Sequence, residues 1–214
     1  MSAMRQASTL RVVLAALALA TALPGVRAQD HSHHGHHEPA ATAPGSVRIK
    51  LPEAAVTDQH GRTARFQSDF VGDRLVVINF IYTTCTTVCP VQSALLADLQ
   101  QRLGQRAGRE VALISVTVDP LRDTPVRLKE FSAQYKAGPG WTFLGGDKQA
   151  VDEVLTAFGV YTPNFADHPA VVLVGDPRSG QWTRFFGFPG SEQIMARVTQ
   201  LQAGRQGAPV ASGN

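Results

Sequence analysis

The sequence lacks the motifs that hold nucleotides, since it has neither a G-x-G-x-x-G stretch nor a P-loop, and it has no internal repeat. Nucleotide chemistry is therefore not supported. Cysteine is almost absent as well: among 214 residues there are only two, Cys85 and Cys89, in the stretch TTCTTVCP. The main question is whether these thiols form a structural disulfide, a redox couple or part of a metal site.

The first 28 residues follow the plan of a secretory signal peptide. Two arginines precede an apolar run at 12–23, and Val26 and Ala28 occupy the −3 and −1 positions of a cleavage site. The run is short for a membrane span, although an uncleaved membrane anchor is the alternative. No cysteine lies near the cleavage site, which excludes a lipoprotein, and no twin arginine is present. We therefore expect the mature protein in a bacterial periplasm.

The mature chain has no net charge. The predicted signal peptide takes three of the 20 basic residues and none of the 17 acidic ones, which leaves 17 of each sign with neutral histidines. A chain with equal numbers of acidic and basic side chains gives no support to nucleic-acid binding. Nucleic acid is therefore not an expected partner.

Residues 29–45 contain no large apolar side chain, so we expect a disordered tail outside the core, and likewise a disordered end at 207–214. Five of the seven histidines lie in this tail. A cloning tag is one explanation. We instead predict a secondary, weak metal-binding segment that gathers Cu(II), Zn or Ni. Its residues are His31, His33, His34, His36 and His37.

Hydrophobic periodicity predicts one domain at 46–206. Residues 46–52 and 58–66 suggest a hairpin with His60 and Gly61 at its turn. The predicted strands are 75–82, 111–118, 141–144, 170–174 and 183–188, and the predicted helices cover 95–103, 122–135, 151–158 and 194–201. A βαβ start and a ββα finish are typical of the thioredoxin-like α/β fold. We expect a central mixed sheet flanked by helices, with an N-terminal β-hairpin and a βα insertion.

Cys85 and Cys89 follow a buried strand and begin a helix, at the carboxyl end of a strand where sites usually form. Four residues apart, their sulfurs can converge, and a helix N-terminus lowers a thiol pKa. A structural disulfide would close so short a loop that it would add only about 2 kcal/mol of stability. A thiol–disulfide oxidoreductase usually has two intervening residues rather than three. This second alternative is weakened but stays open.

His168 is the candidate third ligand, because it directly precedes a buried strand whose entry loop should face the two cysteines. Two thiolates and one imidazole suit Cu(I) and can also hold Cu(II). Asp167 is either a partner that orients this imidazole or a solvated carboxylate. His60 is interpreted as a solvated turn residue, and residues 119–125 as a strand end, a turn and a helix cap.

Four segments in order give the chain a strong resemblance to the SCO (SenC) family. They are NFIYTTCTTVCP at 79–90, SVTVDPLRDTP at 115–125, WTFLGGDKQAVDEVLTAFGV at 141–160 and DHPAVVLVGDP at 167–177. The resemblance runs over roughly 48–204. It implies a thioredoxin-like protein that binds one copper through Cys85, Cys89 and His168. Two positions depart from the family pattern: Thr86, where proline is common, and Pro169, where a small hydroxyl residue is usual.

The hypothesis is therefore a periplasmic copper chaperone, with Cu(I) or Cu(II) as its metal. The resemblance implies delivery to the copper-site subunit of cytochrome c oxidase, and the family is also associated with reduction of that subunit's cysteines. Another periplasmic copper protein is the alternative partner. An enzyme is the competing hypothesis, a thiol–disulfide oxidoreductase or thiol peroxidase with Cys85 and Cys89 as catalytic residues. A third is a metal buffer run by the histidine tail.

Overall fold

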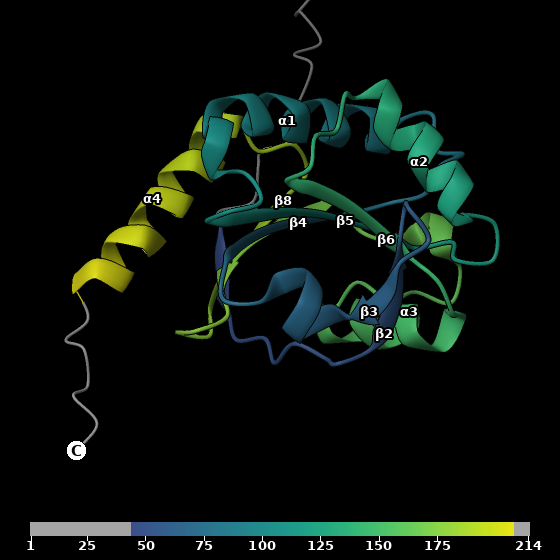
Figure 1. Ribbon diagram of the computed structural model, residues 1–214, viewed down its shortest axis with the longest axis horizontal. Coiled ribbons are helices and arrows are strands. Elements are labelled where there is room, and N and C mark those ends of the chain that lie inside the picture. The colour runs from purple at the N-terminus through teal and green to yellow at the C-terminus, as the bar shows by residue number, and fades with distance from the viewer. Residues whose placement is uncertain (1–43, 208–214) are drawn as a thin grey trace, which may run out of the picture. The chain divides into compact units, whose positions relative to one another are not determined.

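An eight-stranded sheet forms the centre of the protein in the computed structural model, which describes residues 44–207 (Figure 1). Its strand order is β1-β8-β7-β4-β5-β6-β2-β3. The strands are β1 (Gly45–Val47), β2 (Ala55–Asp58), β3 (Thr63–Arg65), β4 (Leu75–Ile81), β5 (Val111–Thr117), β6 (Trp141–Gly145), β7 (Val171–Asp176) and β8 (Gln181–Phe186).

Strands β4 and β5 form the middle of the sheet, and every one of their residues is buried. They pair in parallel, Ile78 opposite Ile114, and β6 continues the parallel part beside β5. On the other side β7 runs antiparallel to β4, with Asn79 opposite Val172. The carboxyl ends of β4 and β5 and the start of β7 therefore lie at the same end of the sheet, which is called the thiol end below.

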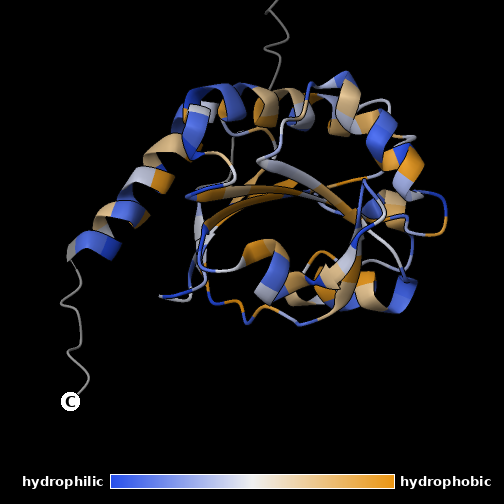
Figure 2. Cartoon of the chain, in the orientation of Figure 1, coloured by the Kyte–Doolittle hydropathy of each residue, from blue (hydrophilic) through white to orange (hydrophobic). Residues whose placement is uncertain are grey.

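Helices cover both faces of the sheet (Figure 1). Helices α1 (Val88–Leu103), α2 (Pro125–Gln134) and α4 (Ser191–Gly207) lie on one face. Helix α3 (Lys148–Ala157) and the π-helical turn η1 (Phe66–Val71) lie on the other, and short 3-10 turns occupy Gly104–Arg106 and Phe165–Asp167. Apolar strands between partly polar helices are evident in the hydropathy colouring (Figure 2).

The buried apolar residues accordingly form two clusters, one on each face. Successive residues of β4 alternate between them: Val77 and Ile81 belong to the cluster with α1, α2 and α4, whereas Ile78 and Phe80 belong to the cluster with η1 and α3. Both cysteines are part of the first cluster. This alternation means that the end of β4 can touch both halves of the core.

Local capping explains where the helices begin and end. The Thr124 side chain accepts a hydrogen bond from the Arg127 N–H, and Pro125 opens α2, as predicted. Helix α1 ends at Gly104, whose φ of +53° is a conformation that glycine adopts without strain. No helix among residues 44–207 is long and apolar enough to cross a membrane.

The thioredoxin-like α/β fold is confirmed, but one strand pairing was wrong. The predicted turn at His60 and Gly61 joins β2 and β3. Residues 46–52, however, do not join this hairpin: Ser46 and Val47 pair with β8, at the opposite edge of the sheet. The reason is that β1 finds its partner more than a hundred residues away, which local periodicity does not reveal. The predicted signal peptide, the histidine residues of the tail and residues 208–214 lie outside the described residues.

Candidate thiol and metal site

The loop between β4 and α1 carries the two cysteines at the thiol end. Cys89 is completely buried in the first turn of α1, and Cys85 is 7% exposed in the preceding loop. Both are free thiols. The backbone N–H of Cys89 donates to the sulfur of Cys85 over 3.4 Å, and the N–H of Cys85 donates to the Tyr82 carbonyl over 3.1 Å. The predicted convergence of the two thiols at a helix start is therefore confirmed.

The two thiols differ in acidity because their surroundings differ. Burial by itself would raise the pKa of Cys85, but hydrogen bonds from the Cys89 thiol and N–H, the Thr87 N–H and the Tyr82 hydroxyl outweigh it and lower the pKa to about 7. Burial raises the pKa of Cys89 well above its ordinary value, and the bond to Cys85 adds to that rise. Cys85 is therefore the thiolate of the pair near neutral pH.

A buried carboxylate holds the cysteine loop in place. Asp123, only 1% exposed, accepts hydrogen bonds from the Thr83 N–H at 3.1 Å, from the Thr83 hydroxyl and from the Thr117 hydroxyl. The sequence interpretation of residues 119–125 as a strand end and helix cap is correct for Thr124 and missed this role. The only signal in the sequence is an aspartate directly before a capping threonine, which normally points to a turn.

His168 lies between the 3-10 turn Phe165–Asp167 and β7, at the thiol end as expected. Its Nδ1 is 2.8 Å from the carbonyl oxygen of Phe165. Because a carbonyl only accepts, Nδ1 carries a proton here, which leaves Nε2 as the ring nitrogen that can bind a metal. The Phe165 carbonyl, and not Asp167, is thus the hydrogen-bond partner found for this imidazole, and the Asp167 carboxylate accepts the amide of Asn164 at 3.0 Å.

Tyr82 connects the histidine to the thiols. Its ring meets His168 edge-on, with centroids 5.8 Å apart, and meets Phe165 edge-on at 5.1 Å. A hydrogen bond with Cys85 raises the pKa of the Tyr82 hydroxyl to about 12. Among residues 44–207, no three Cys, His, Asp or Glu side chains lie close enough together to hold one metal ion. The structure thus brings Cys85 and Cys89 together, and Tyr82 contacts both Cys85 and His168.

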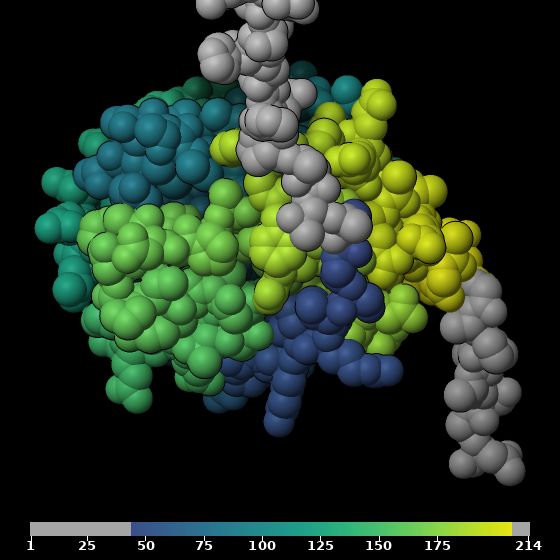
Figure 3. Space-filling model, turned by 180° about the vertical axis from the view of Figure 1, so that it is seen from behind, coloured from purple at the N-terminus to yellow at the C-terminus, as the bar shows by residue number. Residues whose placement is uncertain are grey.

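The reverse side of the domain shows the two segments of this site next to each other, the blue-teal chain around the cysteines and the green chain that precedes β7 (Figure 3). His60 is exposed on the β2–β3 turn, far along the chain from either segment, and its N–H donates to Asp58. It takes no part in this site, which agrees with its interpretation as a solvated turn residue.

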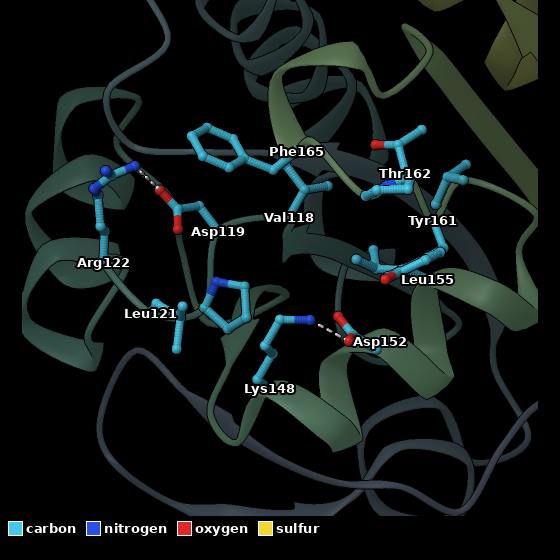
Figure 4. Close-up of a pocket in the computed structure, with 13 residues that line it drawn as sticks. Val118, Asp119, Leu121, Arg122, Lys148, Asp152, Leu155, Tyr161, Thr162 and Phe165 are labelled. Atoms are coloured by element: carbon cyan, nitrogen blue, oxygen red, sulfur yellow. Dashed lines mark hydrogen bonds and ion pairs between the residues drawn. The ribbon is translucent and has the colours of Figure 1, made fainter.

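A cavity of about 310 Å³ is lined in part by Phe165, which also contacts Tyr82 (Figure 4). Two ion pairs line it: Arg122 with the buried Asp119 at 3.1 Å, and Lys148 with Asp152. The Arg122 guanidinium also lies 5.6 Å from the centre of the Phe165 ring. Phe165 therefore contacts both Arg122 of this cavity and Tyr82 of the site.

Comparison with known proteins gives one family. A family model described as SCO1/SenC matches residues 52–202. The SCO1 protein homolog of Bacillus subtilis is 35% identical over 94 residues, which cover 44% of this chain and 47% of that protein. The match thus spans about half the length of this relative.

Solved structures give the same fold. The copper-bound structure of ScoI from Bradyrhizobium japonicum is 26% identical with a TM-score of 0.58, over 71% of this chain and 99% of that one. The structure of BsSco, a member of the Sco family of cytochrome c oxidase assembly proteins in which a disulfide switch was identified, is 24% identical with a TM-score of 0.59, over 73% and 95% of the two chains.

Proposed function

Because the chain belongs to the SCO1/SenC family, whose model covers residues 52–202, we propose that it binds copper through Cys85, Cys89 and His168 and passes it to another protein. The family is associated with cytochrome c oxidase assembly in general, so the proposed acceptor is the copper-site subunit of an oxidase. Another copper protein of the same compartment is the alternative acceptor.

One observation carries the proposal: two free thiols in contact, one of them with a lowered pKa, at the sheet end where His168 also lies. Thiolates are soft ligands that select Cu(I), and an imidazole with a free Nε2 completes a three-ligand set that also holds Cu(II). The donors present therefore fit copper. Copper is the cargo here, and each thiol that binds it releases its proton to the solvent.

Export into the periplasm through residues 1–28 is part of the proposal, with a membrane anchor as its alternative. The histidines of residues 31–37 are proposed as a weaker, secondary site for metal, separate from the site in the folded domain. A disulfide between Cys85 and Cys89 would remove both thiolate ligands. We therefore expect the oxidised protein to bind copper only through the histidine segment.

Copper stoichiometry of the reduced protein tests the ligand set. We expect one tightly bound copper per chain, retained when residues 29–45 are deleted. Cys85→Ala and Cys89→Ala should abolish tight binding, and His168→Ala should weaken it at least tenfold. His60→Ala is the matched control, because this exposed histidine should not matter. Full copper affinity in the His168→Ala variant would contradict the three-ligand site.

A thiol–disulfide oxidoreductase is the second candidate, favoured by the lowered pKa of Cys85 beside a second buried thiol. In that reaction the Cys85 thiolate attacks a substrate disulfide, Cys89 displaces the substrate thiol, and the pair ends as a disulfide that an external dithiol must reduce. Turnover of a model disulfide without copper, unaffected by His168→Ala, would favour this function. Reduction of the acceptor's cysteines before copper transfer would combine both.

A further inference from the structure

Tyr82 contacts His168 with its ring and forms a hydrogen bond with Cys85 through its hydroxyl. Among the interactions of residues 44–207, no other side chain contacts both. Resting on the copper site proposed above, we propose that the Tyr82 ring holds His168 apart from the two thiols in the copper-free protein. Tyr82 is then a positioning residue that sets the copper affinity. It acts through His168 and does not bind the metal itself.

The imidazole is held in its present place by two contacts. Its ring meets the edge of the Tyr82 ring at 5.8 Å and an interplanar angle of 80°, and its Nδ1 is bound to the Phe165 carbonyl at 2.8 Å. Phe165 in turn meets Tyr82 at 5.1 Å and 72°. Edge-to-face aromatic contacts are favourable, and losing one changes an equilibrium by about two- to tenfold. The copper-free position of His168 is therefore stabilised by Tyr82.

Hydrogen bonds and packing restrain both the backbone of Tyr82 and the side chain of Phe165. The Tyr82 carbonyl accepts from the Cys85 N–H at 3.1 Å, and the preceding carbonyl of Ile81 accepts from the Val118 N–H at 2.8 Å. Phe165 is covered on its cavity side by Arg122, which the buried Asp119 anchors (Figure 4). The half-buried Tyr82 side chain is the part of this cluster that can rotate.

The contact between Tyr82 and His168 affects the free energy of copper binding. Copper held by Cys85, Cys89 and His168 needs the three ligands together, whereas in the copper-free protein no three such side chains of residues 44–207 are close enough. In the proposed role, the contact between Tyr82 and His168 is given up when the ligands gather. Whatever stabilises that contact in the copper-free protein weakens the measured affinity by the same factor.

Three variants of the full chain test this. Tyr82→Leu keeps an apolar side chain without the ring, and we expect Cu(I) affinity to rise about three- to tenfold in competition with a chelator. Tyr82→Phe keeps the ring and removes only the hydroxyl that hydrogen-bonds Cys85, so its copper affinity should not rise above that of the parent. In a His168→Ala background Tyr82→Leu should bind copper no more tightly than Tyr82→Phe, because the restrained ligand is gone and both variants lack the hydroxyl.

A second measurement does not depend on affinity. In the copper-free protein the His168 ring protons should show a ring-current shift in NMR spectra, kept in Tyr82→Phe and lost in Tyr82→Leu. Unfolding in urea checks that each variant is folded. Unchanged or weaker copper binding by Tyr82→Leu, or an equal gain in the His168→Ala background, would overturn the role of Tyr82. If His168→Ala alone binds copper like the parent, the ligand set fails first, and the positioning role fails with it.

Discussion

Asp123 ties down Thr83, forty positions earlier in the chain: its carboxylate accepts both the backbone N–H and the hydroxyl of that threonine. The loop that follows β5 thereby fixes the loop that follows β4. Two residues after Thr83 comes Cys85. The position of the accessible thiol is thus set by a carboxylate on a different loop, which stays buried because three donors satisfy it.

Asp123→Ala should therefore cost about 3 kcal/mol of unfolding free energy, because it leaves buried donors of Thr83 and Thr117 without an acceptor. Urea denaturation measures this directly. Glu192→Ala is the control, since Glu192 is 86% exposed and its 3.8 Å pair with Arg102 should contribute little. Similar losses in the two variants would show that the Asp123 contacts do not hold the loop.

Alkylation should distinguish the two thiols. We expect iodoacetamide to modify Cys85 with a rate that rises through pH about 7, because the pKa of Cys85 is lowered and the thiolate is the nucleophile. Cys89 should react far more slowly in the folded protein. Cys89→Ala should move the midpoint of Cys85 to higher pH, since one hydrogen bond to the thiolate is lost. Mass spectrometry of peptides gives both rates, and a Cys85 midpoint at about 8.5 would contradict the assignment.

Stability in acid should depend on Asp176 at the end of the sheet opposite to the thiols. Burial would raise the pKa of Asp176, but the hydrogen bond and charge of Arg205, together with hydrogen bonds from the Arg178 N–H and from Ser179, outweigh burial and lower the pKa. A carboxyl group with a lowered pKa in the folded state contributes stability above its unfolded pKa of about 3.9, and this contribution is lost as pH falls through the folded pKa. Stability from this pair is therefore present at neutral pH.

Asp176→Asn should cost about 3 kcal/mol at pH 7, because it leaves a partly buried guanidinium without its carboxylate. The difference from the parent should shrink as the pH falls below about 4. Urea denaturation between pH 7 and pH 3 measures it. Asp73→Asn is the control: Asp73 is 81% exposed in its pair with Arg178 and should change stability by less than 1 kcal/mol. A gap that is constant with pH would contradict the lowered pKa.

Much of the fold could be predicted because its signals are local. The apolar run at 75–82 became β4, Leu75–Ile81, and the cap at Thr124 and Pro125 became the start of α2. The pairing of β1 with β8 could not be predicted, because a strand of only three residues does not indicate which edge of the sheet it joins. The composition of a segment predicts that it forms a strand, whereas the strand with which it pairs depends on the whole sheet.

The candidate site follows the same division. Cys85 and Cys89 were found from their spacing and their place after a buried strand, and the structure brings them into contact. Tyr82 and Phe165, which pack near the cysteines and His168 in the folded protein, were missed. Tyr82 reads as the end of a strand and Phe165 as an ordinary loop residue, and only the assembled fold places both beside His168.

Cys89 has no exposed surface, while Cys85 retains a little. Events at the pair must therefore occur in a fixed order. An oxidant, an alkylating agent or the ligand of an acceptor protein meets Cys85 first, and Cys89 takes part only after Cys85 is engaged. The geometry thus gives the site a leading and a following sulfur. A trapped intermediate of any exchange should carry its partner on Cys85 alone.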